Sequence, residues 1–181
     1  MFKEYIRKKT LSILCICMML IWAAPASAGW WELQATAGGG DSETVTAGLT
    51  VRYVFEPLYE NNALELRPLA EGSGTFWKHN TDDDEWCAGV SGGLLLVFLR
   101  DGCWRPYLSG EFGAFLISDD EFAERDMGGL LQFRSKGALG VQFGTDFRHS
   151  IQIDAAHYSN GSIYDENKGF NTYGVTYGIR F

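Results

Sequence analysis

The sequence contains no apolar run of about 20 residues, the length that a membrane-spanning helix requires. No long segment repeats apolar residues at a helical period. Cysteine is scarce after residue 28, where only Cys87 and Cys103 remain, and no cluster of Cys and His has the spacing of metal ligands. The glycine triplet 38–40 lacks the lysine and the helix of a phosphate-binding loop. These absences exclude a helical membrane protein, and we expect neither a cofactor nor a bound metal.

Basic residues are also few, with 15 Lys and Arg against 23 Asp and Glu. Four of these basic residues and one acidic residue lie before residue 29, so the remainder carries 11 against 22, a net charge of −11. A chain of this charge repels nucleic acid, and we exclude that class of partner. The acidic excess gathers at 82–85 and 119–126, which we interpret as two solvated loops.

The first 28 residues have the three parts of a secretory signal peptide. Four basic residues, beginning with Lys3, precede the apolar run Leu11 to Ala24, and the small residues Ala26-Ser27-Ala28 follow it. We therefore predict a signal peptide over 1–28, cleavage after Ala28 and export of the chain. The remainder, 29–181, has the length of one domain.

Alternation of apolar and polar residues recurs along 29–181 and is broken by clusters of Gly, Asn and Asp. Between 44 and 55, for example, Val45 and Leu49 have one parity, whereas Thr46 and Arg52 have the other. The pattern predicts eight strands: Trp31 to Gly38, Thr44 to Phe55, Ala63 to Gly72, Trp86 to Leu99, Cys103 to Ser118, Leu130 to Asp146, Arg148 to Ser159 and Asn171 to Phe181. Cys87 and Cys103 then fall at opposite ends of neighbouring strands, which predicts two free thiols.

Alternation alone fits both a soluble sandwich and a membrane barrel whose apolar side chains face lipid. The strands of roughly ten residues favour the barrel, as do Tyr and Trp near strand ends. The last strand ends in Phe181, which resembles the assembly signal of outer-membrane proteins. We predict an all-β fold, an eight-stranded antiparallel transmembrane β-barrel of the outer membrane, because an even number of strands can close.

Loop lengths predict how this barrel lies in the membrane, since short turns face the periplasm and long loops face outward. Arg100-Asp101-Gly102 is a short turn, which places both chain ends at the periplasmic side and the loop Asn160 to Phe170 outside. Eight strands leave a lumen filled by side chains, too narrow for a general pore. Eight charged residues are expected to pair across this lumen: Glu65, Arg67, Glu71, Arg105, Glu111, Arg134, Lys136 and Arg180.

The seventh predicted strand carries a histidine and a serine on its apolar face. His157 and Ser159 share the parity of Ile151 and Ile153, although an ionisable group facing lipid costs stability. Two residues apart on a strand, they stand side by side, so His157 could take the proton of Ser159 for attack on an ester. Without further pattern, the pair would instead be interpreted as part of the polar girdle. Asn160 and the N–H groups of the Gly161-Ser162 turn are the nearest donors for an oxyanion.

The run His157-Tyr158-Ser159-Asn160-Gly161, followed by Asn167, Gly169 and Asn171, resembles the C-terminal motif of the outer-membrane lipid A 3-O-deacylases, the PagL-type family. Trp104-Arg105-Pro106-Tyr107, with Gly110 and Gly113 after it, is similar to a secondary feature of that family. The resemblance implies a serine esterase that hydrolyses the ester-linked 3-position acyl chain of lipid A, which it draws laterally from the outer leaflet. It implies His157 as general base, Ser159 as nucleophile and Asn160 as a contributor to the oxyanion site.

One position departs from the family pattern, because Asn171 stands where we expect a catalytic Glu. Asn171 has the outward parity and lies on the neighbouring strand, so it can accept a hydrogen bond from His157 but supplies no charge. Glu166 or Asp165, in the preceding loop, is the alternative partner of the histidine.

Two other functions compete with the esterase. The first is a non-catalytic small outer-membrane barrel with an anchoring, adhesive or structural role. The second is acyl transfer, against which the outward parity of His157 and Ser159 speaks. The expected partners are lipid A or lipopolysaccharide in the outer leaflet and the outer membrane itself. Formation of a homodimer is left open.

Overall fold

The computed structural model of the chain describes residues 29–79, 84–98, 102–123 and 125–181. The predicted signal peptide and residues Arg100 and Asp101 of the predicted turn lie outside these ranges. Eight long strands are described: β1(Trp30–Gly40), β2(Thr44–Val54), β4(Leu64–Lys78), β5(Glu85–Phe98), β6(Trp104–Ile117), β9(Leu131–Phe143), β10(His149–Ser159) and β11(Phe170–Arg180). Shorter elements are β3(Tyr59–Glu60), β7(Glu121–Phe122), β8(Arg125–Asp126) and the 3₁₀ turns η1(Asp41–Glu43) and η2(Thr145–Phe147).

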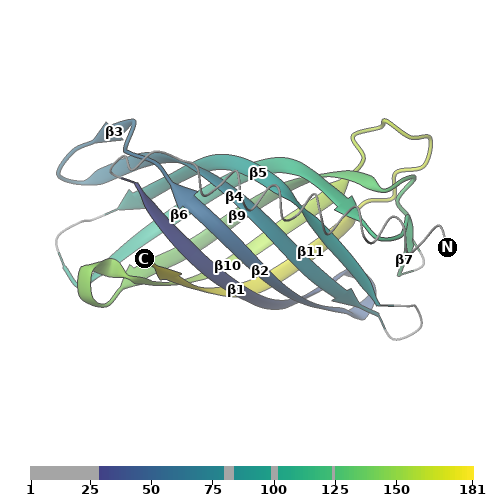
Figure 1. Cartoon of the computed structure of the whole chain (residues 1–181), viewed down its shortest axis with the longest axis horizontal. Helices are drawn as coiled ribbons and strands as arrows, with labels where there is room; N and C mark the ends of the chain where they lie inside the picture. Colours follow the sequence, from purple (N-terminus) through teal and green to yellow (C-terminus); the bar gives the residue numbers. More distant parts are fainter. Residues whose placement is uncertain (1–28, 80–83, 99–101, 124) are drawn as a thin grey trace.

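The eight long strands close into an antiparallel barrel (Figure 1). Their order is β2-β1-β11-β10-β9-β6-β5-β4, and the pairing of β2 with β4 joins the two ends of this sequence. Every pairing is antiparallel, so the predicted eight-stranded barrel is confirmed. Among the described residues, no helix has the length and apolar character needed to cross a membrane.

Three strands differ from their predicted bounds by more than one residue. β1 continues past Gly38 to Gly40, β9 ends at Phe143 before the turn η2 and not at Asp146, and β4 differs most. The expected strand Ala63 to Gly72 ends early, because the glycines at 72 and 74 resemble a turn. In the structure β4 continues to Lys78, and its last residues pair with both neighbours, as in Trp77 with Glu85 and Lys78 with Val45. The prediction was wrong there because strand pairing on both sides extends the strand through these glycines.

The outer surface of the barrel is apolar, as the alternation predicted. In β2, Val45 and Leu49 are each 62% exposed, whereas Thr50 and Arg52 are buried. Apolar side chains outside and polar ones inside are the arrangement of a barrel that is surrounded by lipid. Cys87 is buried and Cys103 exposed, and both are free, as predicted.

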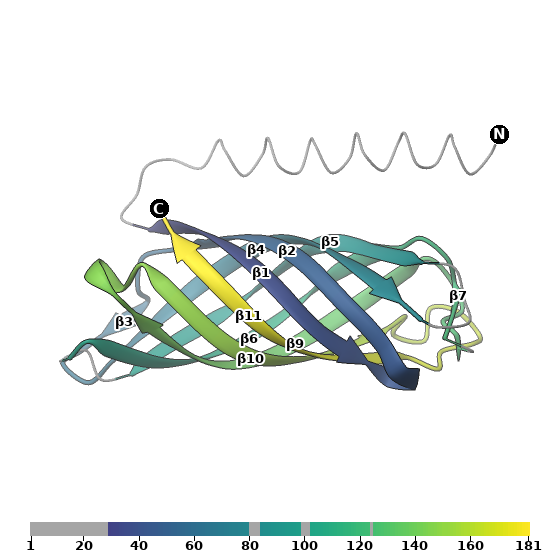
Figure 2. The same cartoon turned by 90° about the horizontal axis from the view of Figure 1, so that it is seen from below.

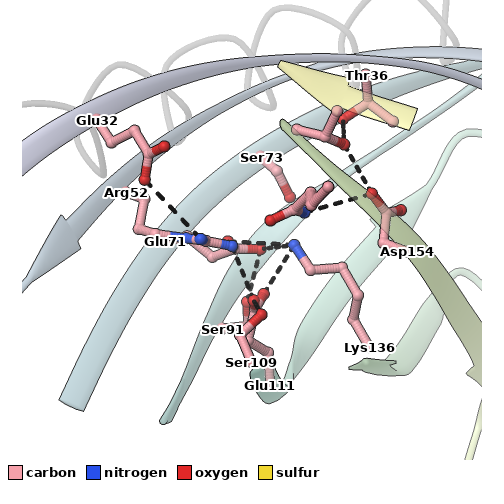
Figure 3. A network of polar contacts seen from close by, with 12 residues as sticks. Glu32, Thr36, Arg52, Glu71, Ser73, Ser91, Ser109, Glu111, Lys136 and Asp154 are labelled. Carbon is pink, nitrogen blue, oxygen red and sulfur yellow. Dashed lines mark hydrogen bonds and ion pairs between the residues drawn. The ribbon is translucent and has the colours of Figure 1, made fainter. Parts of the chain in front are cut away.

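The centre of the lumen holds a buried network of charges (Figure 3). Glu71 and Glu111 lie between Arg52 and Lys136. Arg134 also contacts both carboxylates. Arg52 contacts Glu71 at 3.2 Å and Glu111 at 2.9 Å, and Lys136 contacts Glu71 at 3.0 Å and Glu111 at 2.8 Å. The expected pairing of charges across the lumen is therefore present at its centre.

Apolar clusters close the lumen on both sides of these charges, which the expected pairs of charged residues did not predict. One cluster contains Trp77, Phe115, Tyr158 and Phe170, and the other contains Leu69, Val97 and Tyr107. Large rings fill a narrow barrel and shield the ion pairs from water. Arg180 was expected to pair in the lumen, but its guanidinium lies over the Trp30 ring, 4.2 Å from the centroid.

The two ends of the barrel differ in what they carry (Figures 1 and 2). The C-terminus and β3 lie at one end, and β7 lies at the other. Phe181 donates its backbone N–H to Trp31 at 3.0 Å, so both ends of the described chain lie at the first end, as expected. We call this the terminal end and the opposite one the loop end. Short turns were expected at the terminal end and long loops at the loop end, and two connections differ from this. The connection 55–63 at the terminal end is long, and η1 at the loop end has only three residues.

Candidate functional site

The predicted pair lies on the outer wall at the loop end of β10. His157 is exposed and Ser159 is half-buried, whereas Tyr158 between them is buried in the lumen, so their outward parity is confirmed. In the sheet, His157 is opposite Asn171 of β11 on one side and Ser135 of β9 on the other. Within the described residues no hydrogen bond joins His157 to Ser159, and such contacts often form only when substrate is present.

Asn171 is the side chain that holds the imidazole. Its Oδ1 lies 2.8 Å from His157 Nδ1. The two residues are direct cross-strand neighbours with outward side chains, so the register of β10 with β11 produces this contact. Glu166 and Asp165, the alternative partners, are exposed in the loop, and neither side chain has a hydrogen bond to His157 in the described structure.

Asp41 completes this group of residues, and the sequence offered no signal for it. Its Oδ2 accepts hydrogen bonds from Asn171 Nδ2 at 2.9 Å and from the Asn171 backbone N–H at 3.1 Å. Asp41 begins η1, the turn between β1 and β2, and β1 pairs with β11. Arg125 of β8 contacts the same Oδ2 at 3.5 Å and donates to the Gly169 carbonyl at 3.2 Å.

Asn160 has a different position from the one expected of an oxyanion donor. Its side chain is fully buried, and its Nδ2 donates to the carbonyls of Met127 at 2.9 Å and Glu166 at 2.5 Å. Its Oδ1 accepts from the Ser162 N–H at 2.8 Å, and its own N–H donates to Asn167 Oδ1 at 3.0 Å. Because every N–H of Asn160 and that of Ser162 is already bonded, we correct the expectation: Asn160 holds the loop together.

Glycine is required at 169, directly beside the imidazole. The residue has φ +64°, and a Cβ there would lie 3.0 Å from His157 Cε1. That space is tighter than an ordinary van der Waals contact, so the absence of a side chain lets the ring lie against the loop. Sequence analysis placed Gly169 in the motif, but only the structure shows that it contacts His157.

An apolar groove crosses the outer wall over six neighbouring strands, β1, β11, β10, β9, β6 and β5. Its volume is about 1010 Å³, and its lining includes Gly137, Ala155, Ile153, Tyr173 and Val175. Ala155 precedes His157 on the same face of β10, and Tyr173 follows Asn171 on the same face of β11. The groove therefore borders the site at Ala155 and Tyr173, although His157, Ser159 and Asn171 are not part of its lining. Among the residues that the structure describes, no three His, Cys, Asp or Glu side chains are placed to hold a metal ion.

The barrel is closed, its outer wall is apolar, and a histidine, a serine and an acid lie together at its loop end. These features define the class of protein: an outer-membrane barrel with a candidate hydrolytic site. Known proteins of similar sequence and structure agree with this class. Lipid A deacylase PagL of Pseudomonas aeruginosa is 22% identical over 158 residues, which cover 85% of this chain and 88% of that protein.

Solved structures share the fold. The crystal structure of the outer membrane enzyme PagL has a TM-score of 0.74 at 19% identity, over 82% of this chain and 98% of that one. Neisserial surface protein A (NspA) has a TM-score of 0.53 at 12% identity, over 86% and 98% of the two chains.

Residues 44–180 match the family described as Lipid A 3-O-deacylase (PagL), and the chain belongs to this family. The protein is located in the outer membrane, and its activity is lipid A 3-O-deacylation. The matched segment includes His157, Ser159 and Asn171, whereas Asp41 precedes it.

Proposed function

We propose that the protein hydrolyses the 3-position ester of lipid A with Ser159 as nucleophile and His157 as its base. The observation that carries the proposal is the hydrogen bond from His157 to Asn171 on the lipid-facing wall, directly beside Ser159. An imidazole whose Nδ1 is held in this way presents Nε2 to a neighbouring hydroxyl. The apolar groove next to it has the chemistry that an acyl chain requires.

The reaction follows from these positions. Ser159 Oγ attacks the ester carbon, and its proton passes to His157 Nε2. When the tetrahedral intermediate collapses, the ester C–O bond breaks and His157 returns the proton to the departing 3-hydroxyl of lipid A. Water, activated by His157, then attacks the acyl group on Ser159 and releases the fatty acid.

The oxyanion needs donors, and two groups of the loop have no partner among the described residues. They are the N–H of Gly161 and the side-chain Nδ2 of Asn167. Asn167 Oδ1 accepts from the N–H of Asn160, the residue after Ser159, so its Nδ2 is close to the nucleophile. We assign both groups to the oxyanion site, in place of Asn160.

Mass spectrometry of lipid A tests the proposal. The full chain is expressed in a Gram-negative host, and lipid A is compared for the wild type, Ser159→Ala and the control Ser135→Ala. Ser135 is the outward-facing serine on the other side of His157. We expect loss of one 3-hydroxyacyl mass with the wild type and the control, and none with Ser159→Ala.

Other results of the same experiment contradict the proposal. If the folded wild-type protein leaves lipid A unchanged, the non-catalytic barrel becomes the better hypothesis. A gain of acyl mass would instead support acyl transfer. Loss of the acyl chain with Ser159→Ala would remove Ser159 from the role of nucleophile.

A further inference from the structure

We propose that Asp41 is the acid of this site, a positioning residue that acts through Asn171 on His157. It takes the part that the family pattern gives to a Glu at position 171. The inference rests on the proposed function of His157 and Ser159, and it adds a residue from the far end of the sequence, 130 positions from Asn171.

The hydrogen bonds determine the direction in which Asn171 points. A carboxylate only accepts hydrogen bonds, so the Asn171 atom that faces Asp41 Oδ2 at 2.9 Å must be the amide nitrogen. The amide oxygen then faces His157 Nδ1 at 2.8 Å. An amide oxygen also only accepts, so Nδ1 must carry the proton.

The tautomer of His157 follows from this direction. A neutral imidazole with its proton on Nδ1 has a free electron pair on Nε2, the atom that must take the proton of Ser159. If the amide were reversed, its NH₂ group would face Nδ1 and the proton would move to Nε2. Asp41 therefore selects the tautomer in which His157 is a base, and its negative charge stabilises the imidazolium that forms during attack.

The surroundings of Asp41 hold it at this place. A Cβ at Gly40 would lie 2.8 Å from the Asn171 carbonyl oxygen, so glycine permits the close approach of the two chains. Asp41 is half-buried, and Arg125 contacts the same Oδ2 at 3.5 Å. Arg125 also donates to the carbonyl of Gly169, the residue that contacts the imidazole ring. Three loops thus meet around the pair Asp41 and Asn171.

The test measures the nucleophilicity of Ser159 separately from lipid A hydrolysis. A biotinylated fluorophosphonate is added to the folded full-length protein, and the rate of labelling of Ser159 is followed. In this reaction Ser159 Oγ bonds to phosphorus, fluoride leaves and the serine proton passes to His157. Lipid A mass spectra are recorded for the same variants, and gel mobility without heating shows that each barrel is folded.

Four variants separate positioning from simple structural support. Asp41→Asn should slow both labelling and deacylation by about 10²-fold, because either orientation of Asn171 becomes possible. Asn171→Glu places a carboxylate directly on His157, and should be active. The double variant Asp41→Asn with Asn171→Glu should match Asn171→Glu, because the acid is then supplied at 171. Glu43→Gln, an exposed acid in the same turn, should equal the wild type.

The outcomes distinguish the inference from the function on which it rests. If Asp41→Asn is labelled at the wild-type rate, the inference is overturned. It is also overturned if the double variant stays inactive while Asn171→Glu works, because Asp41 would then only fasten the turn to β11. If Ser159 is labelled in an Asp41-dependent way but lipid A keeps its acyl chains, the positioning role holds and the proposed substrate is wrong.

Discussion

At the scale of the residue, the site depends on a few side chains whose neighbours leave them no freedom. His157 has Asn171 on one ring nitrogen and Gly169 against its Cε1. Asn160 fastens the loop 160–169 by its side chain. The proposed chemistry and the support of the loop are therefore assigned to different residues, and substitutions should separate them.

Gly169→Ala should displace the imidazole without unfolding the barrel. The new Cβ would lie 3.0 Å from His157 Cε1, and φ +64° is strained for alanine by about 1 kcal/mol. We expect labelling of Ser159 by a fluorophosphonate to slow by about 10-fold or more, since small misplacements of a base are costly. Gly74→Ala is the control, because its Cβ would meet nothing within 4 Å. Equal rates for the two variants would show that the ring tolerates the contact.

Asn160→Ala and Asn167→Ala should change different properties, the first the stability of the loop and the second the rate of catalysis. Removing the Asn160 amide leaves the carbonyls of Met127 and Glu166 without their donor, at a cost of about 1–3 kcal/mol. We expect faster proteolysis of the loop 160–169 in this variant. Asn167→Ala removes only the one loop hydrogen bond that Asn167 Oδ1 accepts from the Asn160 N–H. This variant should therefore open the loop less than Asn160→Ala, but lower kcat by about 10²-fold, as loss of an oxyanion donor does. A proteolysis-resistant, active Asn167→Ala protein would remove Asn167 from the oxyanion site.

At the scale of the element, the strands are tied together through the lumen by charges. Glu71 of β4 accepts hydrogen bonds from Arg52 of β2 at 3.2 Å and from Lys136 of β9 at 3.0 Å. It also accepts one from Arg134 of β9. Three cations, of which Lys136 is half-buried, and three buried anions take part: Arg52, Arg134, Lys136, Glu32, Glu71 and Glu111. Such a network is stable only when each charge keeps its partners.

Glu71→Gln should destabilise the barrel and leave its chemistry intact. The change removes one negative charge from among three cations, and breaking a buried pair costs about 3–5 kcal/mol. We expect a lower midpoint of urea unfolding in lipid vesicles, together with a wild-type labelling rate of Ser159 in the fraction that is folded. The exposed Glu43→Gln is the matched control. An unchanged midpoint would mean that water or a neighbouring group compensates the lost charge.

At the scale of the whole molecule, the barrel presents its apolar wall to lipid, and the candidate site lies on this wall at the loop end. Leu49 in β2 is 62% exposed and Leu58 in the connection 55–63 is 68% exposed, so exposure alone does not separate them. Their positions distinguish the two leucines, because Leu49 lies on the lipid-facing wall and Leu58 lies in a connection at the terminal end.

Leu49→Arg should therefore destabilise the protein in a bilayer, whereas Leu58→Arg should not. A charge on the lipid face costs about 2–4 kcal/mol at the membrane midplane and less toward the interface. The midpoint of urea unfolding in vesicles of fixed lipid composition measures the difference. Equal effects of the two substitutions would contradict the position of the membrane around β2.

Much of the barrel is visible in the sequence because its signals are local. A strand places alternate residues on opposite faces, so the apolar parity of Val45 and Leu49 shows the lipid side directly. The same parity predicted that His157 and Ser159 face outward. The end of β4 was missed because glycines at 72 and 74 resemble a turn, whereas pairing with β2 and β5 extends the strand beyond them.

The sequence predicted Asn171 as the partner of His157, and the structure shows this contact. The other partners of the site residues are distant in the sequence, and no pattern in the chain reveals them. Asn160 looked like an oxyanion donor because it follows Ser159, but its amide is bonded to Met127, 33 positions away. Asp41 followed a glycine triplet and was only part of a turn until the pairing of β1 with β11 placed it against Asn171.

The sequence alone determined the strand count, the lipid face, the outward parity of His157 and Ser159 and the absence of a disulfide. Each of these follows from the spacing of residues along one or two neighbouring strands. Only the tertiary structure decided which acid faces Asn171 and which donors remain near Ser159. Closure of the barrel brings the first strand beside the last, and contacts across that seam leave no periodic trace in the chain.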